Sequence, residues 1–96
     1  MTTMLWYPVR IYNGAETSIE MPEGAEVLHV HERQGEVCLW ALVDTEREVE
    51  TRRFVCAGTG HPIQHEVDIF SYIGTVHSAG IVMVYVWHIF EILGDD

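Results

Sequence analysis

The sequence contains no lysine, and this absence limits the partners that we expect the protein to bind. Its five basic residues are all arginine and face fifteen acidic residues, which gives a formal net charge of −10. Binding to DNA or RNA needs a basic surface that neutralises phosphates, so we expect no direct nucleic-acid binding. Such acidity keeps a small protein soluble, and it also suits a protein that occupies the nucleic-acid groove of a partner.

Cysteine and long apolar runs are also scarce. Cys38 and Cys56 lie in apolar, strand-like sequence, which is typical of reduced core side chains rather than of a disulfide framework or a zinc site. No run approaches the roughly 20 apolar residues that span a bilayer. The first ten residues lack the basic and apolar regions of a signal peptide. We therefore expect a cytoplasmic protein that makes no contact with membranes.

Sequence motifs for catalysis are missing as well. There is no G-x-S-x-G nucleophile elbow, and neither cysteine has a histidine or a helix start placed to lower its pKa. Glu48 and Glu50 share a strand face with Arg52, which indicates a solvated surface rather than an acid–base pair. We expect no catalytic residues, no cofactor and no enzymatic activity.

What the chain does contain is a series of short strands. Its 96 residues, 48% of them hydrophobic, suit a single domain over residues 1–96. Residue alternation and turn signals predict strands over 4–12, 17–21, 26–32, 36–44, 48–57, 69–76 and 81–91. The segments 64–68 and 78–80 are predicted as a polar connection and a turn. Six to seven strands at this spacing predict an all-β fold, a small antiparallel sandwich or barrel.

The pattern of apolar residues also predicts how the strands are placed. Strand 36–44 is apolar on both faces, which is typical of a central strand. In strand 26–32, alternation places Leu28 and Val30 on one face and Val27, His29 and His31 on the other. The last strand is again apolar on both faces, although one small domain has a single core. A second subunit would cover the other face, so we expect a homo-oligomer, a dimer above all.

Six histidines raise the question of a metal site. His29 and His31 are two residues apart on a strand, so both side chains emerge on one face, as in some metal sites. The sequence offers no third ligand at a convincing spacing, and a pair of histidines on a polar strand face is the preferred interpretation. We expect no metal, and we expect His88 to be a hydrogen-bonded histidine of the core or of an interface.

The hexapeptide "GTGHPI" (58–63) is the best candidate for a binding site. It follows the densest cluster of positive charge, Arg47, Arg52 and Arg53, and the planar guanidinium suits phosphate or carboxylate. A loop with two glycines can turn its backbone N–H groups toward an anion, and aromatic residues can stack on a planar ligand. The candidate ligand-binding residues are Trp40, Arg52, Arg53, Gly58, Thr59, Gly60 and His61.

The same stretch has a plainer interpretation as a connection between two strands. No lysine and no helix follow the glycines, so it is not a P-loop. In this interpretation the arginines pair with the neighbouring Glu46, Glu48 and Glu50. Alternation places Arg52 and Arg53 on opposite faces of their strand, so at most one of them is expected to reach a shared pocket.

Several short motifs in order resemble a known family. "MPEGAEVLHV", "CLWALVD", "GTGHPI", "YIGTV" and "VWHIFE" are similar to stretches of small uncharacterised proteins that bacteriophages and prophages carry, which are labelled as a domain of unknown function. The matching motifs include Trp40 and residues 58–62. The resemblance implies an accessory protein that binds something of the host. One version is a counter-defence protein that sequesters a small anionic molecule, such as a nucleotide immune signal. The alternative is an acidic inhibitor that blocks a host defence or transcription protein.

Overall fold

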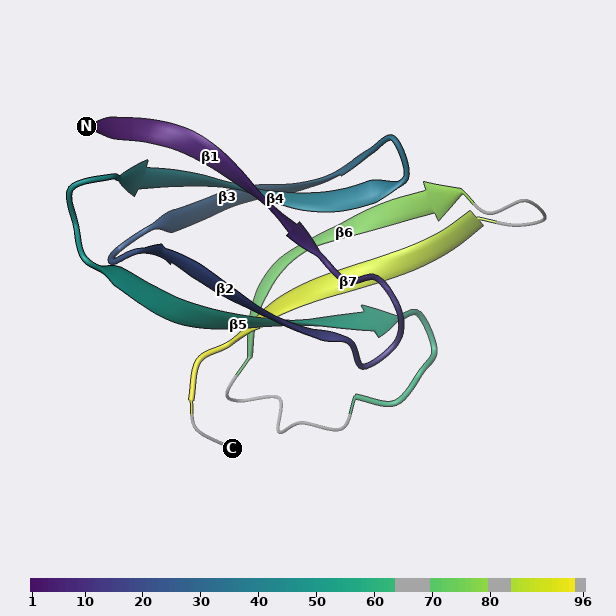
Figure 1. Cartoon of the computed structure of the whole chain (residues 1–96). Helices are drawn as coiled ribbons and strands as arrows, with labels where there is room; N and C mark the ends of the chain where they lie inside the picture. Colours follow the sequence, from purple (N-terminus) through teal and green to yellow (C-terminus); the bar gives the residue numbers. More distant parts are fainter. Residues whose placement is uncertain (64–69, 80–83, 95–96) are drawn as a thin grey trace.

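The chain forms seven strands in two antiparallel sheets that pack together (Figure 1). The computed structural model describes residues 1–63, 70–79 and 84–94. The strands are β1 (Thr2–Val9), β2 (Glu16–Pro22), β3 (Glu26–Arg33), β4 (Glu36–Asp44), β5 (Val49–Gly58), β6 (Phe70–Ala79) and β7 (Val84–Ile92). The prediction of an all-β sandwich is confirmed. Among the described residues, no helix is long and apolar enough to cross a membrane.

The two sheets differ in size and order. One has three strands in the order β1-β4-β3, and the other has four in the order β2-β5-β7-β6. In Figure 1 the smaller sheet lies above the larger one. β4 is the middle strand of its sheet, as predicted from its two apolar faces.

The core fills the space between the sheets. From β4 it takes Val37, Leu39 and Ala41, which are fully buried, and from the larger sheet it takes Phe54 and Ile89. Their neighbours in sequence point away from the core because successive side chains of a strand alternate between the faces. On the outer faces of the sandwich, β4 therefore contributes its even-numbered residues and β5 its odd-numbered residues.

The predicted alternation of β3 is wrong at its start. The register between β3 and β4 shifts between Val27 and His29. Val27 and Val30 both pack against the core, whereas Leu28 is 53% exposed. A β-bulge adds one residue to a strand and so reverses the faces of the residues that follow it.

Two other predicted segments differ from the structure or lie outside it. Ser78 belongs to β6, which continues to Ala79, so the predicted turn does not begin there. Gly80, the polar stretch 64–68 and residues 81–83 of the last predicted strand lie outside the described residues.

The larger sheet receives part of its outer cover from its own chain. Val55 and Ala57 of β5 alternate with core residues and therefore face outward, yet both are buried. Pro62 and Ile63, which follow β5, line a cavity together with these two residues. Part of the apolar outer face of the larger sheet is therefore covered without another subunit. The homo-oligomer stays a prediction.

Candidate functional site

Residues 58–61 of the hexapeptide form a tight turn at the end of β5. The His61 N–H donates to the Gly58 carbonyl at 3.1 Å, and Gly60 has φ +83°. A positive φ at the third position is typical of a type II turn, where glycine is favoured. At Gly58, a Cβ atom would lie 3.1 Å from the His61 ring and 3.2 Å from the Trp87 ring. Each glycine therefore has a structural reason to be there.

The backbone N–H groups of Gly58, Thr59 and His61 have acceptors within the protein. The Gly58 N–H donates to Asn13 Oδ1 at 3.1 Å, and the Thr59 N–H donates to the Val86 carbonyl at 3.3 Å. His61 donates within the turn, and Pro62 has no N–H. A backbone nest binds an anion through N–H groups that converge on it. Since these groups point to protein acceptors, they offer little support for an anion, and anion binding here stays a prediction.

His88 holds the turn against the larger sheet. Its Nε2 lies 2.7 Å from Thr59 Oγ1 and its Nδ1 lies 2.9 Å from Thr75 Oγ1, which in turn contacts the Tyr72 hydroxyl. His88 is hydrogen-bonded, as predicted, but it is half-buried and does not belong to the buried core. Hydroxyl groups both donate and accept, so they can pair with the ring nitrogens of either tautomer. The chain of contacts links the turn to β7 and β6.

Arg52 forms a bidentate ion pair with Glu91 of β7. Arg52 Nε lies 2.7 Å from Glu91 Oε2, and Nη2 lies 2.8 Å from Oε1. Arg52 Nη1 also donates to the Ala25 carbonyl. Both charged side chains are largely buried, with 17% and 10% of their surface exposed. The hydrogen bonds to Glu91 raise the Arg52 pKa above its usual value. The guanidinium therefore binds a carboxylate of its own chain.

The other two clustered arginines are paired as well. Arg53 contacts Glu16 at 3.1 Å, and Arg47 contacts Glu23 at 3.8 Å. The ion-pair partners are therefore distant in sequence, although the charge of the neighbouring Glu50 also helps to raise the Arg52 pKa. Arg53 and Gly58 are five residues apart on β5, which separates their backbones by about 17 Å. The structure does not bring the arginines and the glycine turn into one site.

Trp40 lies in a third place, on the outer face of the smaller sheet. It stands between Trp6 of β1 and His29 of β3, and the next row contains Met4 and Leu42. We call this surface the Trp6 face, and its members are Met4, Trp6, His29, Trp40 and Leu42. Trp6 is 47% exposed, Met4 42% and Leu42 37%. No described residue of this chain covers the face, so it is an aromatic and aliphatic surface open to solvent.

Charged residues border the Trp6 face. Glu26 is the β3 neighbour of Leu42, while Glu36 and Asp44 alternate onto the same side of β4. Arg33 of β3 lies opposite Glu36 in the register of the two strands. Cys38 also alternates onto this side, but it is buried, and desolvation followed by the nearby Glu36 raises the pKa of its thiol. The border is thus mainly acidic, and the thiol stays protonated at neutral pH.

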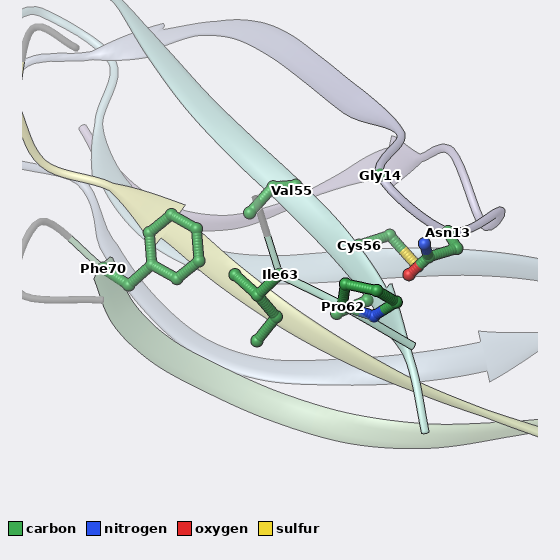
Figure 2. A pocket seen from close by; sticks show the side chains of 8 residues that line it. Asn13, Gly14, Val55, Cys56, Pro62, Ile63 and Phe70 are labelled. Atoms are coloured by element: carbon green, nitrogen blue, oxygen red, sulfur yellow. The ribbon is translucent and has the colours of Figure 1, made fainter. Parts of the chain in front are cut away.

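A cavity of about 250 Å³ lies over the outer face of β5 (Figure 2). β5 contributes Val55 and Ala57, the segment after the turn contributes Pro62 and Ile63, and β6 contributes Phe70. Asn13 and Gly14, from the connection between β1 and β2, complete the described lining together with Cys56. None of these residues is charged. Both cysteines are free and buried, and burial raises the Cys56 pKa to about 11.

The structure shows no cluster for a metal ion within the described part of the chain. No three histidine, cysteine, aspartate or glutamate side chains lie close enough together there. The rings of His29 and His31 stack with their centroids 5.9 Å apart. This pair contributes to the edge of the Trp6 face.

A scan against protein-family models matches residues 1–94 to a domain of unknown function, DUF7352. The chain belongs to this family. The family description names no activity, ligand or partner. No curated protein matches the chain, and no solved structure matches it either. The geometry of the glycine turn, the arginine ion pairs, the Trp6 face and the cavity over β5 therefore carries the functional reasoning.

Several residues of these places were not singled out by the sequence. Asn13, Thr75 and Glu91 become visible as partners only when the strand order is known. Trp6 and Met4 lie in an aromatic and β-branched segment that predicts a strand but not its solvent-facing side. Alternation in β4 places Trp40 and Leu42 on one face, but only the burial of Leu39 and Ala41 in the structure shows that this face is the outer one.

Proposed function

We propose that this protein is a non-enzymatic binding module that docks on a basic partner protein through the Trp6 face. The observation that carries the proposal is an exposed aromatic surface on a protein of net charge −10. Contiguous exposed apolar surface on a soluble protein marks interaction sites. Tryptophan is enriched among the residues that dominate binding energy.

The charge distribution supports a basic partner. Glu26, Glu36 and Asp44 border the face, whereas Arg47, Arg52 and Arg53 each contact a carboxylate of their own chain. Three of the five arginines are in this way paired within the chain, and the excess of carboxylates remains. A complementary partner presents arginine or lysine around an apolar contact patch.

The resemblance to phage and prophage proteins extends the proposal to a biological setting. The partner would be a host defence or transcription protein in the host cytoplasm, and the acidic surface would occupy its nucleic-acid groove. Sequestration of a small anionic molecule through Arg52, Arg53 and residues 58–61 is the other candidate. It has less support, because both arginines and the N–H groups of Gly58, Thr59 and His61 already have partners within the chain. Calorimetry with cyclic and ADP-ribose-type nucleotides tests it directly.

The docking proposal is tested by site-specific crosslinking followed by binding to the purified partner. A photo-crosslinking residue at position 6 is compared with one at Tyr12, which is more exposed than Trp6 (61% against 47%) but lies outside the face. We expect a basic protein to be captured from position 6 and not from position 12. Trp6→Ala should then weaken binding by about tenfold or more, since truncating a hot-spot tryptophan costs about 2 kcal/mol or more and about 1.4 kcal/mol is a factor of ten.

Matched variants and salt complete the test. Tyr12→Ala should leave the affinity unchanged, and added NaCl should weaken binding because salt screens complementary charges. Capture from both positions alike, an affinity that Trp6→Ala leaves unaltered, or binding that is insensitive to salt would each overturn the proposal.

A further inference from the structure

The geometry points to a binding site for a small uncharged aromatic molecule in the cavity over β5, separate from the Trp6 face. The site lies on the opposite sheet and needs neither the acidic surface nor a protein partner. Nothing in the family description assigns it a ligand.

The size of the cavity sets the size of the ligand. Its volume is about 250 Å³, whereas an engineered protein cavity of about 150 Å³ holds benzene. Sites for drug-sized ligands begin at roughly 300 Å³. The cavity therefore suits a bicyclic ring such as indole, and it is too small for a nucleotide.

The lining sets the chemistry. Val55, Ala57, Pro62 and Ile63 offer aliphatic surface, and Phe70 offers an aromatic ring (Figure 2). The Phe70 ring is itself held by Phe90, with centroids 5.2 Å apart. A charged ligand would lose its hydration without a counter-charge among the described lining residues, which is costly. An uncharged ring loses little hydration and gains contact on several sides.

Hydrogen bonds fix one wall of the cavity and the turn that leads into the other wall. On one side, the Gly14 N–H donates to the Cys56 carbonyl at 2.8 Å, and the Gly58 N–H donates to Asn13 Oδ1. On the other side, the turn at Gly60 and the contact between Thr59 and His88 direct the chain back over the sheet, where Pro62 and Ile63 follow. A preformed pocket avoids the ordering cost that weakens small-ligand binding. The hexapeptide thus builds a wall of this cavity.

The experiment is a titration of the isotope-labelled protein with indole, followed by NMR. We expect saturable shifts at residues that line the cavity, with a Kd in the range of about 0.1–1 mM, as suits a fragment of this size. Indole-3-carboxylate, which has the same ring with a negative charge, should bind at least about tenfold more weakly. Shifts without saturation, shifts centred elsewhere or equal binding of both compounds would overturn the inference.

Variants locate the site. Ala57→Leu fills the cavity from its floor and should abolish indole binding, while Thr51→Leu adds the same side chain to an exposed position on the same face of β5 and should not. If Ala57→Leu fails to fold, Ile63→Lys serves instead, because Ile63 is 41% exposed and tolerates a longer side chain. A lysine at this wall should weaken indole binding, and an unchanged Kd in the folded variant would refute the site.

Discussion

At the scale of single residues, two glycines decide how closely parts of the fold approach each other. At Gly58, the rings of His61 and Trp87 fill the space that a side chain would need. At Gly74 of β6, a Cβ atom would lie only 2.4 Å from Val30 Cγ1 of β3. Val30 is a core residue, so Gly74 lets the edge of one sheet rest directly on the other.

Gly74→Ala is expected to destabilise the protein by about 1–3 kcal/mol, the usual cost of forcing extra atoms into a packed core. The measurement is urea denaturation of the variant and the parent protein. Gly74 does not have a positive φ, so the added methyl group acts through the contact with Val30 and not through backbone strain.

A double variant separates these two causes. Val30→Ala removes the clashing methyl groups, so Gly74→Ala should cost much less in that background. Gly35→Ala is the control, because Gly35 has φ +84° and open space around it. Its cost, about 1–2 kcal/mol, comes from the backbone and should persist when Val30 is alanine. Equal costs of Gly74→Ala in both backgrounds would contradict the packing described here.

At the scale of elements, the strands follow from local sequence, but the contacts between them do not. The predicted strand 36–44 coincides with β4, and 48–57 differs from β5 by one residue at each end. The predicted alternation of β3 failed at the register shift between Val27 and His29, and β6 has a similar shift between Tyr72 and Gly74. A bulge depends on the partner strand, and a single strand's pattern does not contain that information.

The partners of the candidate binding residues were also not predictable from local sequence. The sequence contains its densest cluster of positive charge at Arg47, Arg52 and Arg53, but the partners of these side chains depend on strand order. β7 lies next to β5 and places Glu91 beside Arg52, although 39 residues separate them in sequence. Residues 52 and 58 are close in sequence yet far apart in space, because an extended strand rises by about 3.3 Å per residue.

The ion pair between Arg52 and Glu91 is expected to hold β5, β7 and the start of β3 together. Arg52→Met should lower the free energy of unfolding by about 3–5 kcal/mol, since it leaves the Glu91 carboxylate buried without its partner. Adding Glu91→Leu to this variant should recover much of the loss, because no unpaired charge then remains. Chemical denaturation measures both effects.

Arg53 provides the matched control for this prediction. Its pair with Glu16 is more exposed, so Arg53→Met should cost about 1 kcal/mol or less. Equal losses for the two arginines would show that burial does not distinguish the pairs. A double variant that is less stable than Arg52→Met alone would show that the ion pair is not the source of the effect.

At the scale of the whole molecule, the excess of negative charge affects folding and binding in opposite directions. With fifteen acidic and five basic residues, the folded chain brings like charges together and is destabilised by their repulsion. Salt screens this repulsion, since the Debye length falls from about 30 Å at 0.01 M to about 3 Å at 1 M. The same screening weakens attraction to a basic partner.

The melting temperature is therefore expected to rise by several degrees between about 0.01 M and 0.5 M NaCl, while the affinity for the partner falls. Glu20→Gln combined with Glu48→Gln is the control. Both side chains are exposed, and the change lowers the net charge from −10 to −8, so the rise in melting temperature should be smaller. A melting temperature that falls with salt would mean that the internal ion pairs outweigh the repulsion. If it rises while binding weakens, the loss of affinity cannot come from unfolding, and the acidic surface itself must contribute to the complex.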